Sequence, residues 1–116
     1  MVRIPDDEFE RMVGEVFDAL PDDMVRPVEN VAILIEDQPA GARPRLFGLY
    51  SGRPLTSRSV YGFGELPDRI VLFREPLLAV CDDLEHVKDE IHVTLVHEIA
   101  HFYGIDDDEL HRLGWG

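Results

Sequence analysis

Two histidines and a glutamate near the end of the sequence, His97, Glu98 and His101 in VHEIAH, have the types and spacing of a metal-dependent hydrolytic site. Residues four positions apart on an α-helix project from nearly the same side, so both imidazoles can bind one metal ion. Glu98 lies beside the first histidine, from where its carboxylate can reach a metal-bound water without being a ligand. The pattern predicts a zinc site that hydrolyses a peptide-like bond, with Glu98 as the catalytic residue.

A third protein ligand is expected shortly after the second histidine, because catalytic zinc sites usually combine three protein ligands with one open position. Gly104 can adopt a positive φ, end the helix and turn the chain back beneath the metal. Asp106, Asp107 and Asp108 follow this glycine and are the candidates. Asp106 stands three residues before Glu109, as a helix N-cap does, which favours Asp107 as the ligand. Asp108 fits better as part of an acidic first helical turn.

The predicted reaction is hydrolysis by a zinc-bound water, from which Glu98 accepts a proton that it then passes to the leaving amine. A second group that stabilises the developing oxyanion is expected, and the candidates are Arg58, Tyr61 and His111. Few residues follow Asp107. We therefore expect a shallow, open site with modest activity on generic peptides, or a site that a protein partner completes.

The run HEIAHFYGIDDDEL extends the motif to H-E-x-x-H-x-x-G-x-x-D, from His97 through Gly104 to Asp107. It is similar to the zinc signature of metzincin-type metallopeptidases. Together with LFGLYSGRPLTSRS and LPDRIVLF, it resembles a family of small bacterial zincin-like metallopeptidases once classed as a domain of unknown function. The resemblance implies a zincin fold and a zinc ion, supports Asp107 as the third ligand, and leaves the substrate open.

The sequence departs from the metzincin pattern downstream of the signature. Metzincins carry a methionine turn there, whereas DELHRLGWG follows Asp107 and contains no methionine. The space beneath the metal must therefore be filled differently, and His111 and Leu113 are the candidates. His111 is also considered as a substitute ligand or as a hydrogen-bond partner of a ligand.

Two other functions fit the same residues. In the first, zinc only stabilises a small fold, or the domain is a non-proteolytic binding module. Structural zinc sites favour four protein ligands and often cysteines, and Cys81 is the only cysteine, so an open catalytic site is favoured. In the second, the enzyme is a zinc amidase that acts on a non-peptide amide. Calcium or magnesium on the acidic run is disfavoured, because paired imidazoles suit zinc better.

Apolar periodicity around the motif predicts an α+β fold in a single zincin-like domain over residues 1–116, with a small mixed sheet. An N-terminal amphipathic helix and a long helix that carries the motif are expected, with Asp82 or Asp83 as the N-cap of the second. A short helix ends the chain. The expected helices are 9–20, 82–103 and 107–113, and the expected strands are 31–35, 46–50 and 70–73. The first strand, VAILI, reads as buried.

Acidic residues outnumber basic ones by 24 to 11, which gives a net charge of −13 and argues against nucleic acid or an anionic membrane surface as the main partner. A peptide or protein substrate is expected instead. The start of the chain does not read as a secretory signal and no apolar run is long enough to cross a bilayer, so we expect a cytoplasmic protein.

One stretch reverses the acidic character of the chain. Residues 38–64 contain no acidic residue but four arginines, which are Arg43, Arg45, Arg53 and Arg58. This stretch either borders the cleft, where it attracts an acidic segment or a terminal carboxylate, or is a solvated loop, and the second interpretation is favoured. Away from the motif, Cys81 is expected to be a small buried hydrophobe, and His86 and His92 to be solvated or at the edge of the core.

Overall fold

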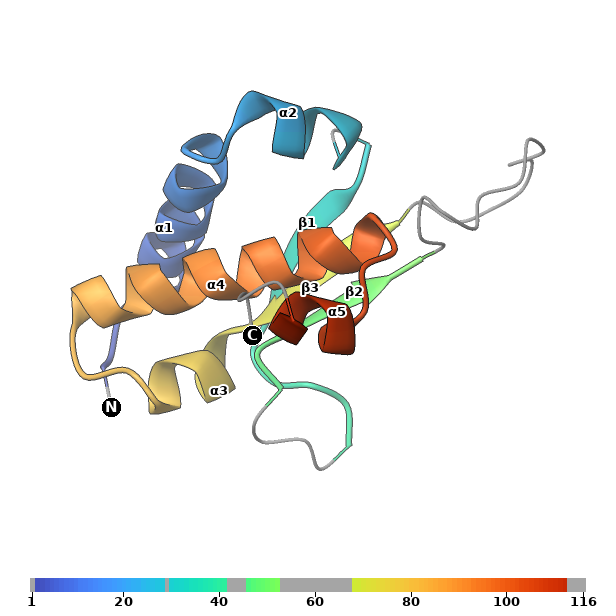
Figure 1. Ribbon diagram of the computed structural model, residues 1–116. Coiled ribbons are helices and arrows are strands. Elements are labelled where there is room, and N and C mark those ends of the chain that lie inside the picture. Colours follow the sequence, from blue (N-terminus) through green and yellow to red (C-terminus); the bar gives the residue numbers. More distant parts are fainter. Residues whose placement is uncertain (1, 29, 42–45, 53–67, 113–116) are drawn as a thin grey trace.

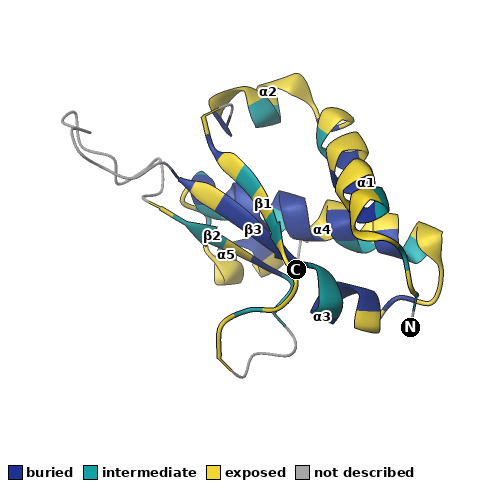
Figure 2. Ribbon diagram, turned by 180° about the vertical axis from the view of Figure 1, so that it is seen from behind, coloured by how far each residue is buried: buried dark blue, intermediate teal, exposed yellow. Residues whose placement is uncertain are grey.

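The computed structural model describes residues 2–28, 30–41, 46–52 and 68–112. The described helices are α1 (Asp6–Asp18), α2 (Asp22–Val25), a 3-10 turn (Arg26–Val28), α3 (Arg74–Ala79), α4 (Leu84–Phe102) and α5 (Asp107–Arg112). The described strands are β1 (Ala32–Glu36), β2 (Gly48–Ser51) and β3 (Arg69–Phe73). Figure 1 shows α4 lying along one face of the sheet, and the opposite view in Figure 2 places the sheet in front of α4. The predicted α+β class is confirmed.

The sheet is small and mixed, with the strand order β1-β3-β2. The central strand β3 is parallel to β1 and antiparallel to β2. Within the described residues, β1 and β2 are therefore edge strands. Helix α4 packs against both β3 and β2, so the helix with the histidine motif reaches from the middle of the sheet to one of its edges.

The hydrophobic core lies between α4, α1 and the sheet. Side chains from all three are fully buried, such as Phe9 on α1, Leu72 on β3 and Leu95 on α4. In Figure 2 the buried residues lie on the inward sides of the helices and strands. Fully burying a side chain of this size stabilises the fold by roughly 1.5–3 kcal/mol. This core holds α4 rigidly and thereby fixes the positions of the side chains on its outer face.

The prediction that the first strand is buried is wrong. Residues of β1 alternate between exposed and half-buried, and the side chain of Leu34 is 41% exposed. The physical reason is that β1 lies at an edge of the sheet and has helices on one face only, where Ile33 and Ile35 pack against the core. A β-branched apolar run has the same composition whether one face or both faces are covered.

The ends of the helices follow the sequence closely, although two short helices are additional. Asp83 caps α4 by accepting a hydrogen bond from the backbone N–H of His86 at 2.8 Å, which decides between the two predicted caps. The helices α2 and α3 were not expected. Helix α3 has a proline at its third position, Pro76, where the first helical turn tolerates it because its missing N–H would have no partner there.

Gly48 allows β2 to approach α4 closely. A Cβ atom at this position would lie 2.6 Å from Thr94 Cγ2 and 3.3 Å from Glu98 Cγ. Thr94 is itself buried and cannot easily move. We expect Gly48→Ala to lower the free energy of unfolding by about 1–3 kcal/mol in chemical denaturation, because the new methyl overpacks this contact.

Two variants test the cause of that loss. Gly14→Ala is the control, because no atom lies within 4 Å of its added Cβ in the middle of α1, and it should stabilise by about 0.5–1 kcal/mol. Thr94→Ser removes the obstructing methyl, so the double variant Gly48→Ala with Thr94→Ser should recover much of the stability that Gly48→Ala alone loses. An unchanged stability of Gly48→Ala would mean that the close approach is relieved at no cost.

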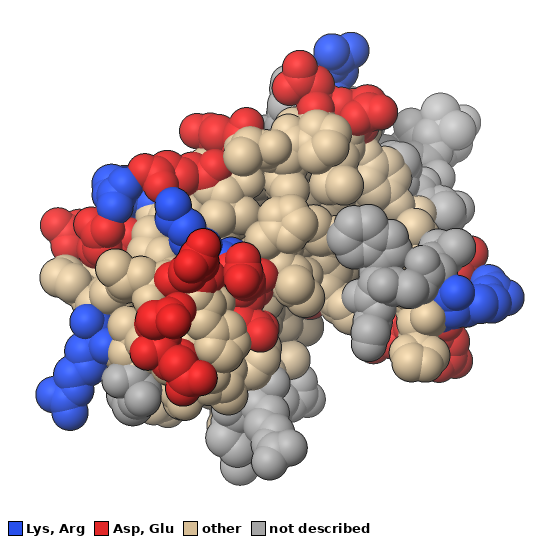
Figure 3. Space-filling model, turned by 60° about the vertical axis from the view of Figure 1, so that its left-hand side comes forward, with Lys and Arg blue, Asp and Glu red and all other residues tan. Residues whose placement is uncertain are grey.

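Acidic side chains dominate the surface. On the face shown in Figure 3 they form several groups, with only scattered Lys and Arg between them. Such a surface attracts cations, including metal ions, and repels anions. In the described part of the chain, no helix combines the length and the apolar character needed to span a membrane. Cys81 is buried as predicted, and burial raises the pKa of its thiol to about 11, so it is protonated near neutral pH.

Candidate metal centre

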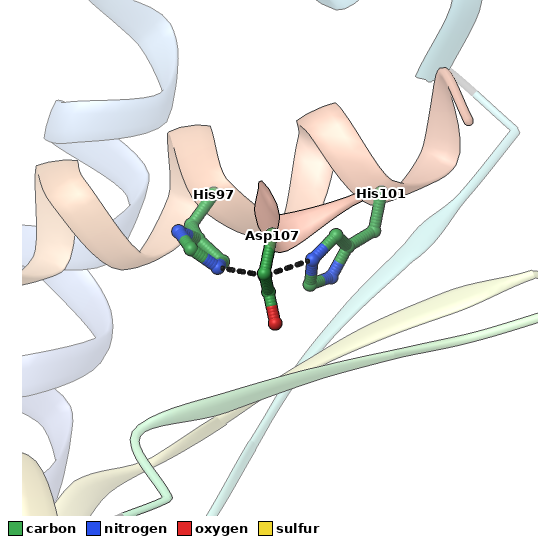
Figure 4. Close-up of side chains that lie close together, drawn as sticks. All are labelled: His97, His101 and Asp107. Atoms are coloured by element: carbon green, nitrogen blue, oxygen red, sulfur yellow. Dashed lines mark hydrogen bonds and ion pairs between the residues drawn. The ribbon is translucent and has the colours of Figure 1, made fainter. Parts of the chain in front are cut away.

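His97 and His101 lie one turn apart on the outer side of α4. Their side chains are partly accessible, at 30% and 27% exposure, while the neighbouring Ile99 is buried in the core. Figure 4 shows both rings projecting from the same side of the helix. The ring centroids are 4.9 Å apart and the planes lie at 80° to each other. The helical spacing therefore places the two imidazoles together as predicted.

The chain turns back toward the histidines directly after α4. Gly104 has a positive φ of 87°. Its N–H donates to the carbonyl of His101 at 2.9 Å, and the N–H of Ile105 donates to the carbonyl of Ala100 at 2.9 Å. This pair of bonds is the Schellman arrangement, which satisfies the last carbonyls of a helix and needs a left-handed residue. The turn brings the start of α5 beneath the histidines.

The three consecutive aspartates at this turn have different surroundings. Asp106 Oδ1 accepts a hydrogen bond from the N–H of Glu109 at 2.8 Å and so caps α5. Asp107 is the first residue of α5 and lies between the two histidines (Figure 4). Asp108 is exposed in the same first turn. The structure therefore agrees with the assignment of Asp106 as the cap of α5 and leaves Asp107 free to face the histidines.

The three candidate ligand atoms converge on one point. Asp107 Oδ1 lies 2.7 Å from His97 Nε2 and 2.8 Å from His101 Nε2, and all three atoms lie within 4.8 Å of one another. Among the residues described, this is the one group of three such side chains close enough to hold a metal ion. The hydrogen bonds from His101 and His97 lower the pKa of Asp107 below its ordinary value, so its carboxylate stays charged.

The donor set fits zinc. Two imidazole nitrogens and one carboxylate oxygen are ligands that Zn²⁺ prefers, and three protein ligands leave one position open. Around a tetrahedral zinc with bonds of about 2.0–2.2 Å, ligand atoms are roughly 3.3–3.6 Å apart. The present distances between the aspartate oxygen and the imidazoles are shorter by several tenths of an ångström. Asp107 can withdraw by that amount, because its side chain is 73% exposed.

Glu98 lies on the side of α4 that faces the sheet, and its residue is only 6% exposed. Its Oε1 accepts a hydrogen bond from the backbone N–H of Tyr50 in β2 at 2.8 Å and lies 3.0 Å from His101 Nδ1. A carboxylate beside Nδ1 favours the tautomer with the proton on that nitrogen, which leaves Nε2 free for a metal. The structure thus places Glu98 against the second histidine and the edge strand.

The two carboxylates on either side of His101 set its protonation in the metal-free protein. Burial opposes the charged imidazole, but the hydrogen bond to Asp107 and the charge of Glu98 outweigh it and raise the pKa of His101 above 6.5. Zinc must displace the proton from Nε2. Zinc affinity is therefore expected to fall with decreasing pH, by up to about tenfold per pH unit for each proton displaced. As the pH is lowered, zinc affinity should begin to fall at a pH above the ordinary histidine pKa.

Competition titrations with a zinc chelator across the pH range test this expectation. Glu98→Gln is the informative comparison, because it removes a charge that raises the pKa of His101 and should move the fall in affinity to lower pH. A fall that begins at the same pH in both proteins would contradict the assigned cause.

Other predicted residues are not brought to the centre. His111 is exposed on α5 and is not in the metal-binding group, so its proposed roles find no support in the geometry. His86 and His92 lie elsewhere on α4, half-buried and exposed respectively. The side chain of α5 that packs against the fold is Leu110, which sequence reasoning missed. Outside the described residues lie Arg43, Arg45, Arg53, Arg58, Tyr61 and Leu113.

One described segment of the acid-free stretch, β2, lies beside the centre, while the four arginines lie outside the described residues. The N–H of Tyr50 in that strand binds Glu98. Neither Tyr50 nor Gly48 was singled out from the sequence. A glycine inside a strand pattern often marks a close approach of another chain segment, and Gly48 was a signal of this kind.

Comparisons with known proteins identify a family and a similar fold. The sequence model of one protein family, described as zincin-like metallopeptidase, matches residues 28–115. Among solved structures, a conserved hypothetical protein from Thermus thermophilus is similar, with a TM-score of 0.58 and 23% sequence identity over 95% of this chain and 97% of that chain. At this identity the likeness concerns the fold. No curated protein matches the chain significantly.

Proposed function

The chain belongs to the zincin-like metallopeptidase family, and on that basis we propose that it hydrolyses peptide bonds with a zinc ion held by His97, His101 and Asp107. The observation that carries the proposal is the convergence of their three ligand atoms within 4.8 Å, on a donor set that suits zinc. Three protein ligands leave a position for water, which a structural site with four protein ligands does not.

Bound zinc supplies Lewis-acid activation of a water molecule and of the scissile carbonyl. Glu98 is the proposed general base. Its Oε1 is held by the N–H of Tyr50 and the Nδ1–H of His101, so Oε2 is the oxygen that takes a proton from the attacking water. The same oxygen then gives the proton to the leaving amine, so that the products are a carboxylic acid and an amine and Glu98 returns to its carboxylate form.

Peptide is the favoured substrate because of where the centre lies. Strand β2 is an edge strand of the described sheet, and an extended peptide can pair with the backbone of an edge strand. The N–H of Tyr50 points from this strand toward Glu98. A peptide lying along β2 would therefore pass close to the proposed general base. The protein partner that would complete the cleft stays a prediction.

Metal and activity measurements on the same preparation test the proposal. The protein is stripped with a chelator and dialysed, and zinc is then titrated back while a mixture of internally quenched peptides is assayed. We expect one zinc per chain, and cleavage that appears in proportion to bound zinc. Stoichiometric zinc without cleavage of any peptide would favour the non-proteolytic alternative, and cleavage of simple amides alone would favour an amidase.

A further inference from the structure

A side-chain hydrogen bond joins β2 to the residue that precedes β3. The hydroxyl of Tyr50 donates to Asp68 Oδ2 at 2.6 Å, and Asp68 is only 7% exposed. Tyr50 pairs with Ile70 across the antiparallel ladder, so Asp68 is its diagonal neighbour on the same face. We call this Tyr50–Asp68 hydrogen bond the strand clasp. It starts from the next-to-last residue of β2, directly before Ser51.

The backbone of the strand end is packed tightly against the same carboxylate. A Cβ atom at position 52 would lie 2.4 Å from both Asp68 Cγ and Asp68 Oδ1, so a side chain there would displace the Asp68 carboxylate. Asp68 is therefore held between the Gly52 backbone and the Tyr50 hydroxyl. The strand clasp holds the Tyr50 side chain, and the contact of Gly52 with Asp68 holds the main chain at this end of β2.

The other end of Tyr50 reaches the metal centre. Its backbone N–H donates to Glu98 Oε1 at 2.8 Å, and its ring packs edge-on against Phe102 of α4, with centroids 6.0 Å apart. One residue thus connects the buried Asp68 with the proposed general base. In an edge strand only four residues long, the position of this N–H depends on how firmly the strand end is held.

We infer that Tyr50 and Asp68 are positioning residues, which hold β2 so that its Tyr50 N–H orients the Glu98 carboxylate. This inference rests on the proposed role of Glu98. Without the strand clasp, the end of β2 moves more freely and Glu98 loses a fixed donor on Oε1. Small displacements of a catalytic group slow a reaction strongly, while substrate and metal affinities that use other groups change little.

The test compares Tyr50→Phe with Tyr103→Phe. Both changes remove one tyrosine hydroxyl from a ring that packs edge-on against Phe102, but the Tyr103 hydroxyl donates to the carbonyl of Met24 at 2.7 Å, away from Glu98. We expect kcat of Tyr50→Phe to fall roughly ten- to a hundredfold, with KM and zinc affinity unchanged within about twofold. Tyr103→Phe should keep the kcat of the wild type.

Amide hydrogen exchange at residue 50, followed by NMR in the metal-free protein, gives a readout that does not depend on activity. Exchange should be roughly tenfold faster in Tyr50→Phe and in Asp68→Ala, which removes the acceptor, than in the wild type, and unchanged in Tyr103→Phe. Unchanged exchange, or faster exchange with an unaltered kcat, overturns the inference. A wild type that neither binds zinc nor cleaves peptide defeats the proposed function, whereas the exchange data still decide whether the strand clasp holds the Tyr50 N–H.

Discussion

Replacing Glu98 by glutamine is expected to lower kcat for peptide hydrolysis by roughly a hundred- to ten-thousandfold while zinc stays bound at one per chain. The amide cannot accept a proton from water, so the general base is lost. Its oxygen can still accept the hydrogen bonds from Tyr50 N–H and His101 Nδ1–H, so the local structure should survive. The measurements are steady-state cleavage of a quenched peptide and zinc content after dialysis.

Two further substitutions on α4 serve as controls. Glu90 is half-buried, near His86, and Glu90→Gln changes the charge equally, so it should leave kcat within about twofold of the wild type. Glu98→Ala also removes the acceptor of the Tyr50 N–H and should lower the free energy of unfolding by about 1–3 kcal/mol more than Glu98→Gln does. If Glu98→Gln kept nearly full activity, Glu98 would be a buried structural carboxylate and not the general base.

Replacing Asp107 by alanine is expected to weaken zinc binding at least about a hundredfold, since even outer-shell partners of metal ligands contribute ten- to a hundredfold. The physical reason is that Asp107 Oδ1 is the atom that lies within 3 Å of both imidazoles, and it carries the charge that offsets the ion. Competition titration of the stripped protein with a chromogenic chelator measures the change. Peptide cleavage at a fixed low zinc concentration should fall in parallel.

The neighbouring aspartates provide matched controls for this substitution. Asp108→Ala removes the same charge one residue further along α5 and should alter zinc affinity by less than about threefold, as expected for an exposed charge. Asp106→Ala removes the cap of α5 and should destabilise the protein by about 1 kcal/mol, with a smaller effect on zinc than Asp107→Ala. If Asp107→Ala bound zinc as tightly as Asp108→Ala, the third ligand would lie elsewhere.

Much of the helical structure could be predicted because its signals are local. The apolar spacing on α4, the acidic cap at Asp83 and the left-handed glycine at Gly104 act within a few residues of themselves. Asp106 could be distinguished from Asp107 for the same reason, because an N-cap side chain pairs with the residue three positions later. The short helices α2 and α3 were missed, because each has too few turns to produce a periodic pattern.

The burial of the strands could not be predicted in the same way. The apolar run of β1 suggested a covered strand, but Leu34 is 41% exposed because β1 is at the edge of the sheet. Strand order depends on contacts between distant segments, and β1 pairs with β3 over more than thirty intervening residues. No local pattern in residues 31–35 carries that information.

The sequence by itself determined that His97 and His101 project from one side of a helix and that the chain reverses at Gly104, because both follow from backbone geometry within two helical turns. Only the tertiary structure decided where Glu98 points. Its carboxylate lies against the backbone of Tyr50, which is 48 residues away in sequence and is brought close by the packing of β2 on α4. The ligand set was therefore a local property, whereas the environment of the proposed base arises from long-range packing.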